Sequence, residues 1–102
     1  MAHFAQLVRI LWAAAAVISP MGIAESGQSK GQALYISKGC YACHGYAGQG
    51  AATGPRIAGT PLPLEAFAEL VRRPANVMPA YSPRVLTDQE LRELHTFVQS
   101  LR

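Results

Sequence analysis

Apolar residues recur at helical spacing in two segments of the second half of the chain. The apolar positions of the first segment share one helical face and are Leu64, Phe67, Leu70 and Val71. Pro74 ends this helix at Arg72 or Arg73, because the residue before a proline avoids helical backbone angles. The pattern predicts a helix from about Leu64 to Arg72 or Arg73.

The second amphipathic segment runs to the C-terminus. Thr87 and Glu90 have the spacing of a capping box, which predicts where this helix begins. His95 lies one position off the apolar face, so its side chain is predicted to be solvated. The apolar face itself consists of Leu91, Leu94, Val98 and Leu101, with Phe97 beside it.

A further helix is predicted from about Lys30 to Ser37. Ser29 and Gln32 fit a second capping box, and Gly39 closes the helix. The stretches Gly45–Pro63 and Pro74–Pro83 are rich in glycine and proline and show little periodicity, so both are predicted to be loops. No alternating, strand-like run is present. The sequence therefore predicts an all-α domain with three main helices and long loops.

The N-terminal segment reads as a secretory signal peptide. Met1–Arg9 carries one arginine and no acidic residue, Ile10–Ala24 is almost wholly apolar, and small residues precede Glu25. The alternative is an uncleaved membrane anchor. The apolar run is shorter than the roughly 20 residues that a spanning helix needs, and Pro20 interrupts its end. We therefore predict a signal peptide over residues 1–24 and one domain over residues 25–102.

Composition narrows the class of protein further. The chain has 102 residues and a formal net charge of +3, and loss of Arg9 with the signal peptide would leave eight basic and six acidic residues, a net charge of +2 that is too mild to indicate a nucleic-acid partner. A domain this small buries a small core and often needs a staple or an organising ligand. A disulfide between its only cysteines, Cys40 and Cys43, would close too short a loop to constrain the unfolded chain much.

Those cysteines belong to the motif Cys40-Tyr41-Ala42-Cys43-His44. A C-x-x-C-H sequence is the attachment signature of a c-type haem: each thiol forms a thioether with one haem vinyl group, and the histidine becomes an iron ligand. A zinc site would need a fourth ligand, and a thioredoxin-like dithiol would need a βαβ context. The motif therefore predicts one covalent haem c, with His44 on the iron.

The sixth iron position has two candidate ligands. Met78 is the only methionine after residue 24, and it lies beside Pro79 in the second predicted loop. A thioether stabilises ferrous iron and raises the reduction potential. The alternatives are that Met78 only packs on the haem edge, or that His95 is the ligand. The predicted solvation of His95 favours Met78.

These motifs together resemble the class I bacterial cytochromes c over Gly31–Leu101. Gly31 and Tyr35 resemble the family's glycine and aromatic on the first helix, which crosses the last helix near the glycine. The Leu-x-x-aromatic pair of the last helix is matched by Leu94 and Phe97, although tyrosine is commoner than phenylalanine there. Met78-Pro79 resembles the distal ligand loop.

Further site residues follow from the resemblance. Gly54-Pro55 resembles the family's Gly-Pro, which implies that the Pro55 carbonyl accepts a hydrogen bond from His44. Arg56 is our candidate for binding a haem propionate, because arginine suits two-pronged carboxylate recognition. Arg72, Arg73 and Arg84 are weaker candidates for the same role.

The resemblance implies a periplasmic one-electron carrier that cycles Fe(III)/Fe(II). We find no paired carboxylates and no nucleophile-base cluster, so no enzymatic activity is predicted. The partners would be redox proteins, either a periplasmic dehydrogenase of which the chain is a subunit or members of a respiratory chain. The alternative function is a haem-based ligand-binding or sensing protein in which the sixth iron position is open or labile. No stable membrane insertion is expected if the signal peptide is cleaved.

Overall fold

The computed structural model describes residues 27–102, so the predicted signal peptide over residues 1–24 lies outside the described part. The described part of the chain forms four helices in the order α2 (Gly27–Ser37), α3 (Cys40–His44), α4 (Leu64–Arg72) and α5 (Asp88–Ser100). Residues 27–102 contain no strand, and their only β-type pairing is an isolated bridge between Ala51 and Gly54. The all-α prediction is confirmed.

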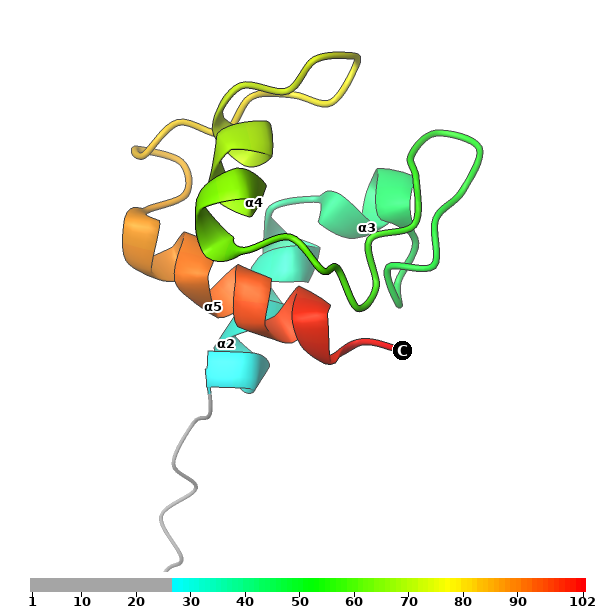
Figure 1. Cartoon of the computed structure of the whole chain (residues 1–102), viewed down its shortest axis with the longest axis horizontal. Coiled ribbons are helices and arrows are strands. Elements are labelled where there is room, and N and C mark those ends of the chain that lie inside the picture. Colours follow the sequence, from blue (N-terminus) through cyan, green and yellow to red (C-terminus); the bar gives the residue numbers. More distant parts are fainter. Residues whose placement is uncertain (1–26) are drawn as a thin grey trace, which may run out of the picture.

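Helices α2 and α5 cross in close contact (Figure 1). Gly31 permits the contact, because a Cβ atom there would lie 2.5 Å from Cβ of Phe97 and would also collide with the Glu93 carbonyl oxygen. One turn further along α2, the ring of Tyr35 packs at a tilt against Phe97, with 5.6 Å between the ring centroids. The expected crossing of these two helices at Gly31 is thus present.

The core lies beneath this crossing and extends to α4. Its members are apolar side chains with little exposure: Tyr35, Phe67, Val71, Leu86, Leu91, Leu94, Phe97 and Val98. Most of the apolar faces expected from the sequence therefore point inward. Leu70 departs from its expected place in the apolar face of α4, since its side chain is half exposed.

The ends of α2 and α5 differ in how well the sequence predicted them. At α5, the Thr87 hydroxyl accepts from the backbone N–H of Glu90, and the Glu90 carboxylate accepts from the backbone N–H of Thr87. The predicted capping box is therefore formed. Helix α2 begins at Gly27, so the prediction of Ser29 as its N-cap is wrong. Nothing in Gly27–Ser29 blocks helical backbone angles, and the helix continues through these residues.

The prediction of a solvated His95 is also wrong. The side chain is only 8% exposed, and its ring lies against Phe67 with 5.0 Å between the centroids. Nε2 donates a hydrogen bond to the Leu62 carbonyl oxygen at 2.8 Å. The periodicity of α5 could not reveal this burial, because the covering residue comes from the loop between α3 and α4.

Among residues 27–102, no helix combines the length and the apolar character that crossing a bilayer requires.

Candidate functional site

A cavity of about 510 Å³ lies between α3, α4 and the loops that follow them. Its volume is in the range of about 300–1,000 Å³ that is usual for cofactor and ligand sites. Most of its wall is apolar and comes from core residues such as Phe67, Val71, Leu86, Leu94 and Val98. The polar and sulfur-bearing groups on the wall include Cys40, Cys43, His44 and Met78. The cavity therefore joins residues from all four of these helices and from both long loops.

The imidazole of His44 is held in a defined orientation at this cavity. Its Nδ1 lies 2.7 Å from the carbonyl oxygen of Pro55. A carbonyl oxygen can only accept a hydrogen bond, so Nδ1 carries the proton and Nε2 keeps its lone pair. His44 itself is buried, which leaves the cavity as the place where Nε2 can meet a further partner. This is the tautomer that a metal-ligating histidine needs.

The two thiols are presented by the short helix α3, which the sequence did not predict as a helix. Gly39 precedes it with a left-handed backbone (φ = 80°), which separates α3 from the end of α2. Cys40 and Cys43 are both free thiols and both lie on the cavity wall. Three residues in a helix nearly complete one turn, so both sulfur atoms reach the same side.

The environment of Cys40 does not favour redox-dithiol chemistry. Burial raises the pKa of its thiol to about 11. Reactive dithiols have a lowered thiol pKa, because the thiolate is the nucleophile. The described residues also contain no group of three or more histidine, cysteine or acidic side chains that could hold a metal ion.

Gly54 allows the loop that carries Pro55 to approach α3. A Cβ atom at Gly54 would lie 2.7 Å from the Cys43 carbonyl oxygen. A second tie comes from α2, where the Tyr35 hydroxyl donates to the Gly45 carbonyl oxygen at 2.6 Å. Burial is the main reason why the pKa of Tyr35 is raised to about 12, so this hydroxyl keeps its proton. Both contacts fix the backbone on either side of the His44–Pro55 pair.

Comparison with known proteins bears on this arrangement. The family model described as cytochrome c oxidase, cbb3-type, subunit III matches residues 27–98. The chain belongs to this cytochrome c family. No curated protein and no solved structure matches the chain. Cytochrome c domains of this family bind haem c covalently and serve in electron transfer with redox partners.

The cavity of this cytochrome c domain fits that cofactor. Two free thiols one helical turn apart, an imidazole with a free nitrogen and an apolar wall are the groups that a covalent haem requires. The donor set also includes the Met78 thioether, a soft ligand suited to iron. The chain thus binds haem c.

The loop between α4 and α5 brings Met78 to the same cavity as His44. Met78 is half-buried and packs against the core, whereas its neighbour Val77 is 91% exposed. The loop is tied down beyond Met78, where the Tyr81 backbone N–H donates to the Val71 carbonyl oxygen at 3.0 Å. The Tyr81 hydroxyl donates to the carbonyl oxygen of Lys38, just before α3.

The candidate arginines are not brought to the cavity wall. Arg56 is exposed, although its neighbours Pro55 and Ile57 both line the cavity. Arg73 forms an exposed ion pair with Glu69, and Arg84 is exposed. The Arg72 side chain is only 16% exposed and binds protein groups, so its donors are not available to a propionate. His95 is also absent from the wall, and its Nε2 lies 2.8 Å from the Leu62 carbonyl oxygen.

Sequence reasoning missed Leu70 as part of this site. Leu70 lines the cavity, which explains why a residue on the apolar face of α4 is half exposed. Helical periodicity marks Leu70 as apolar-facing, but it cannot separate the core from a cofactor cavity.

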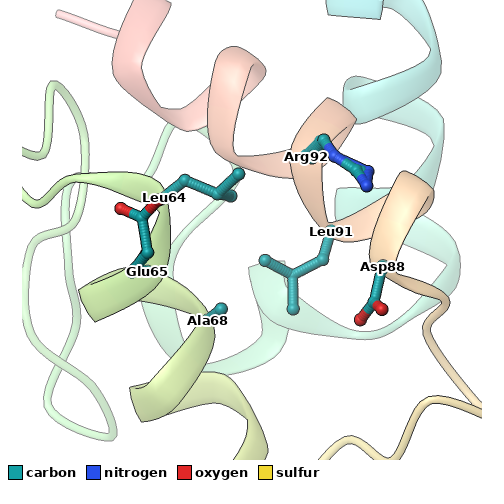
Figure 2. Close-up of a pocket in the computed structure, with 6 residues that line it drawn as sticks. All are labelled: Leu64, Glu65, Ala68, Asp88, Leu91 and Arg92. Atoms are coloured by element: carbon teal, nitrogen blue, oxygen red, sulfur yellow. The ribbon is translucent and has the colours of Figure 1, made fainter.

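A second, smaller cavity of about 230 Å³ lies between α4 and α5 (Figure 2). Its wall combines the apolar side chains of Leu64, Ala68 and Leu91 with the charged side chains of Glu65, Asp88 and Arg92. It contains neither a sulfur atom nor an imidazole, so it offers no ligand for haem iron.

Proposed function

We propose that residues 25–102 form a one-electron carrier in which His44 and Met78 are the axial ligands of the haem iron. Cys40 and Cys43 hold the haem through thioether bonds. The haem supplies the Fe(III)/Fe(II) couple, and the chain's own residues bind it, orient it and set its surroundings. With both axial positions filled by side chains, the iron has no open position for substrate chemistry.

One observation carries this proposal: Nδ1 of His44 donates to the Pro55 carbonyl, while Met78 lines the same cavity. The hydrogen bond orients the ring, leaves Nε2 as the ligating atom and makes the imidazole more electron-rich. The Met78 thioether favours the ferrous state and raises the reduction potential. The apolar wall excludes water, which favours the same state because the ferrous site carries less charge.

The proposed export and localisation of the protein rest on the sequence. Residues 1–24 direct export and are removed, so the domain works in the periplasm, where it is not anchored to the membrane. Its partners are redox proteins: a dehydrogenase that supplies electrons, or members of a respiratory chain. The family description names an oxidase subunit, which supports a respiratory role. Arg56, next to two residues of the cavity wall, is proposed to meet a propionate that extends beyond the cavity.

The decisive experiment is the absorption spectrum of the protein produced with a haem-maturation system. The proposal expects covalent haem by mass and a near-infrared methionine-to-ferric-iron charge-transfer band. Covalent haem without this band would refute Met78 ligation and favour the ligand-binding or sensing function. Absence of covalent haem would refute the site altogether. Co-purification with a larger subunit would separate a dehydrogenase subunit from a free shuttle.

A further inference from the structure

Residues 74–80, here called the Met78 loop, are held by hydrogen bonds of the backbone that flanks them and not by backbone hydrogen bonds of their own. Among the described residues, backbone-to-backbone hydrogen bonds include none that involves residues 74–80. Ala75, Asn76, Val77, Pro79 and Ala80 are all exposed. The position of Met78 therefore depends on how firmly the two ends of this loop are held.

Arg72 holds the C-terminal end of the loop. It is the last residue of α4, and its side chain is only 16% exposed. Nη1 donates to the carbonyl oxygens of Tyr81, at 3.0 Å, and of Leu86, at 2.5 Å. Nη2 donates to Oδ1 of Asp88, the first residue of α5, at 2.8 Å. One guanidinium thus joins the end of α4 to the carbonyl oxygens of Tyr81 and Leu86 and to the first residue of α5.

The chemistry of the side chain suits this task. A guanidinium presents several N–H donors in a rigid, planar fork, whereas a lysine ammonium is a compact point charge on a flexible stem. Hydrogen bonds from a charged donor are stronger than those between neutral groups. The backbone N–H of Tyr81 also donates to the Val71 carbonyl oxygen, so the backbone three residues after Met78 is held at both its N–H and its carbonyl.

We propose that Arg72 is a positioning residue that keeps Met78 at the haem iron and sets how often the thioether leaves it. This inference rests on the proposed axial role of Met78. Arg72 does not line the cavity and does not contact Met78, so it can act on Met78 only through the segments that its guanidinium holds. Loosening of the loop end would let residues 74–80 move, because no backbone hydrogen bond of their own holds them.

The test compares Arg72→Lys with Arg73→Lys. Arg73 is the matched control: it is the adjacent arginine, it is exposed, and its partner is Glu69, one turn earlier in α4. We expect Arg72→Lys to weaken the near-infrared methionine band and to raise the rate of carbon monoxide binding to the ferrous protein about tenfold, the loss of one charge-assisted hydrogen bond. Hydrogen exchange of the Tyr81 amide should accelerate in parallel. Arg73→Lys should behave as wild type in all three measurements.

Asp88→Asn removes the ion pair of Arg72 and leaves its hydrogen bonds to the Tyr81 and Leu86 carbonyl oxygens in place. The Asp88 side chain is 83% exposed, and exposed ion pairs contribute little. We therefore expect a smaller effect than that of Arg72→Lys. An equal effect would show that the ion pair, and not the bonds to the loop carbonyls, is responsible, which overturns the inference.

The outcomes distinguish the two proposals. If wild-type protein shows no methionine band, Met78 ligation fails and the role of Arg72 falls with it. If wild-type protein shows the band and the Arg72 and Arg73 variants are indistinguishable, the inference about Arg72 alone is overturned.

Discussion

Nδ1 of His44 lies 2.7 Å from the carbonyl oxygen of Pro55, eleven positions further along the chain. The contact joins α3 to a loop that has no regular secondary structure around Pro55. Its effect is chemical as well as structural, because it assigns the proton to Nδ1 and reserves Nε2 for another partner. The loop reaches this position because residue 54 is glycine, which avoids a collision with the Cys43 carbonyl.

Gly54→Ala should weaken this hydrogen bond. The added Cβ would lie 2.7 Å from the Cys43 carbonyl oxygen, so the Pro55 segment must move away from His44. A weaker bond makes the imidazole a poorer electron donor, and we expect the reduction potential of the haem protein to rise. Redox titration measures the potential, and proton NMR of the His44 Nδ1–H reports the bond. Ala52→Ser, at an exposed position of the same loop, should change neither.

Met78→Ala should open the sixth iron position. The near-infrared methionine band should disappear, the reduction potential should fall with the loss of the soft sulfur ligand, and the ferrous protein should bind carbon monoxide without denaturant. Val77→Ala is the matched control, since Val77 is the neighbour of Met78 and its side chain is 91% exposed. A Met78→Ala protein with an unchanged potential and no carbon monoxide binding would contradict axial ligation by Met78.

Gly31→Ala should destabilise the fold through the crossing of α2 and α5. The new Cβ would collide with Cβ of Phe97 and with the backbone of Glu93, which belong to a rigid helix and cannot move aside locally. We expect a loss of about 1–3 kcal/mol in the free energy of unfolding, the usual cost of overpacking. Urea denaturation measures it. Gln32→Ala, exposed in the same helix, should stay close to wild type.

The capping box of α5 should make part of the stability depend on pH. The backbone N–H of Thr87 holds the pKa of the Glu90 carboxyl below its usual range. A carboxyl with a lowered folded-state pKa contributes stability that is complete above its unfolded pKa of about 4.3 and is lost as the pH falls through the folded value. Glu90→Gln should therefore lose less stability than wild type on acidification through this window.

Thermal unfolding at a series of pH values checks that expectation. Thr87→Ala provides the complementary variant, and we expect it to cost about 1 kcal/mol at neutral pH through loss of the N-cap acceptor. If Glu90→Gln and wild type lose stability in parallel as the pH falls, the carboxylate contributes nothing through this bond.

Local sequence signals predicted those features that depend on residues close together in the chain. The Thr87–Glu90 capping box and the inward faces of α4 and α5 follow from spacing within one helix, and the structure contains them. The motif Cys40–His44 likewise places two thiols and an imidazole together by chain connectivity alone. The start of α2 was predicted too late, because a capping-box pattern at Ser29 marks a preferred start and does not prevent an earlier one.

Features that depend on distant segments were accessible to the sequence only through the family resemblance, or not at all. The crossing at Gly31 and the Pro55 contact with His44 belong to the first kind. The burial of His95 beside Leu62 belongs to the second kind, since the position of His95 in the helical pattern predicted a solvent-exposed side chain. The same holds for Arg72, which looked like one of several surface arginines and is bound to the loop and to α5.

The sequence by itself determined the helical class, the haem-attachment motif and the presence of a soft candidate ligand, Met78. Those properties follow from residue identity and from the spacing of near neighbours, which the chain carries in any conformation. Only the tertiary structure decided which imidazole faces the cavity and which arginine holds the Met78 loop. Such choices depend on which carbonyl oxygens are brought within hydrogen-bond distance, and that is set by how the loops pack over α4 and α5.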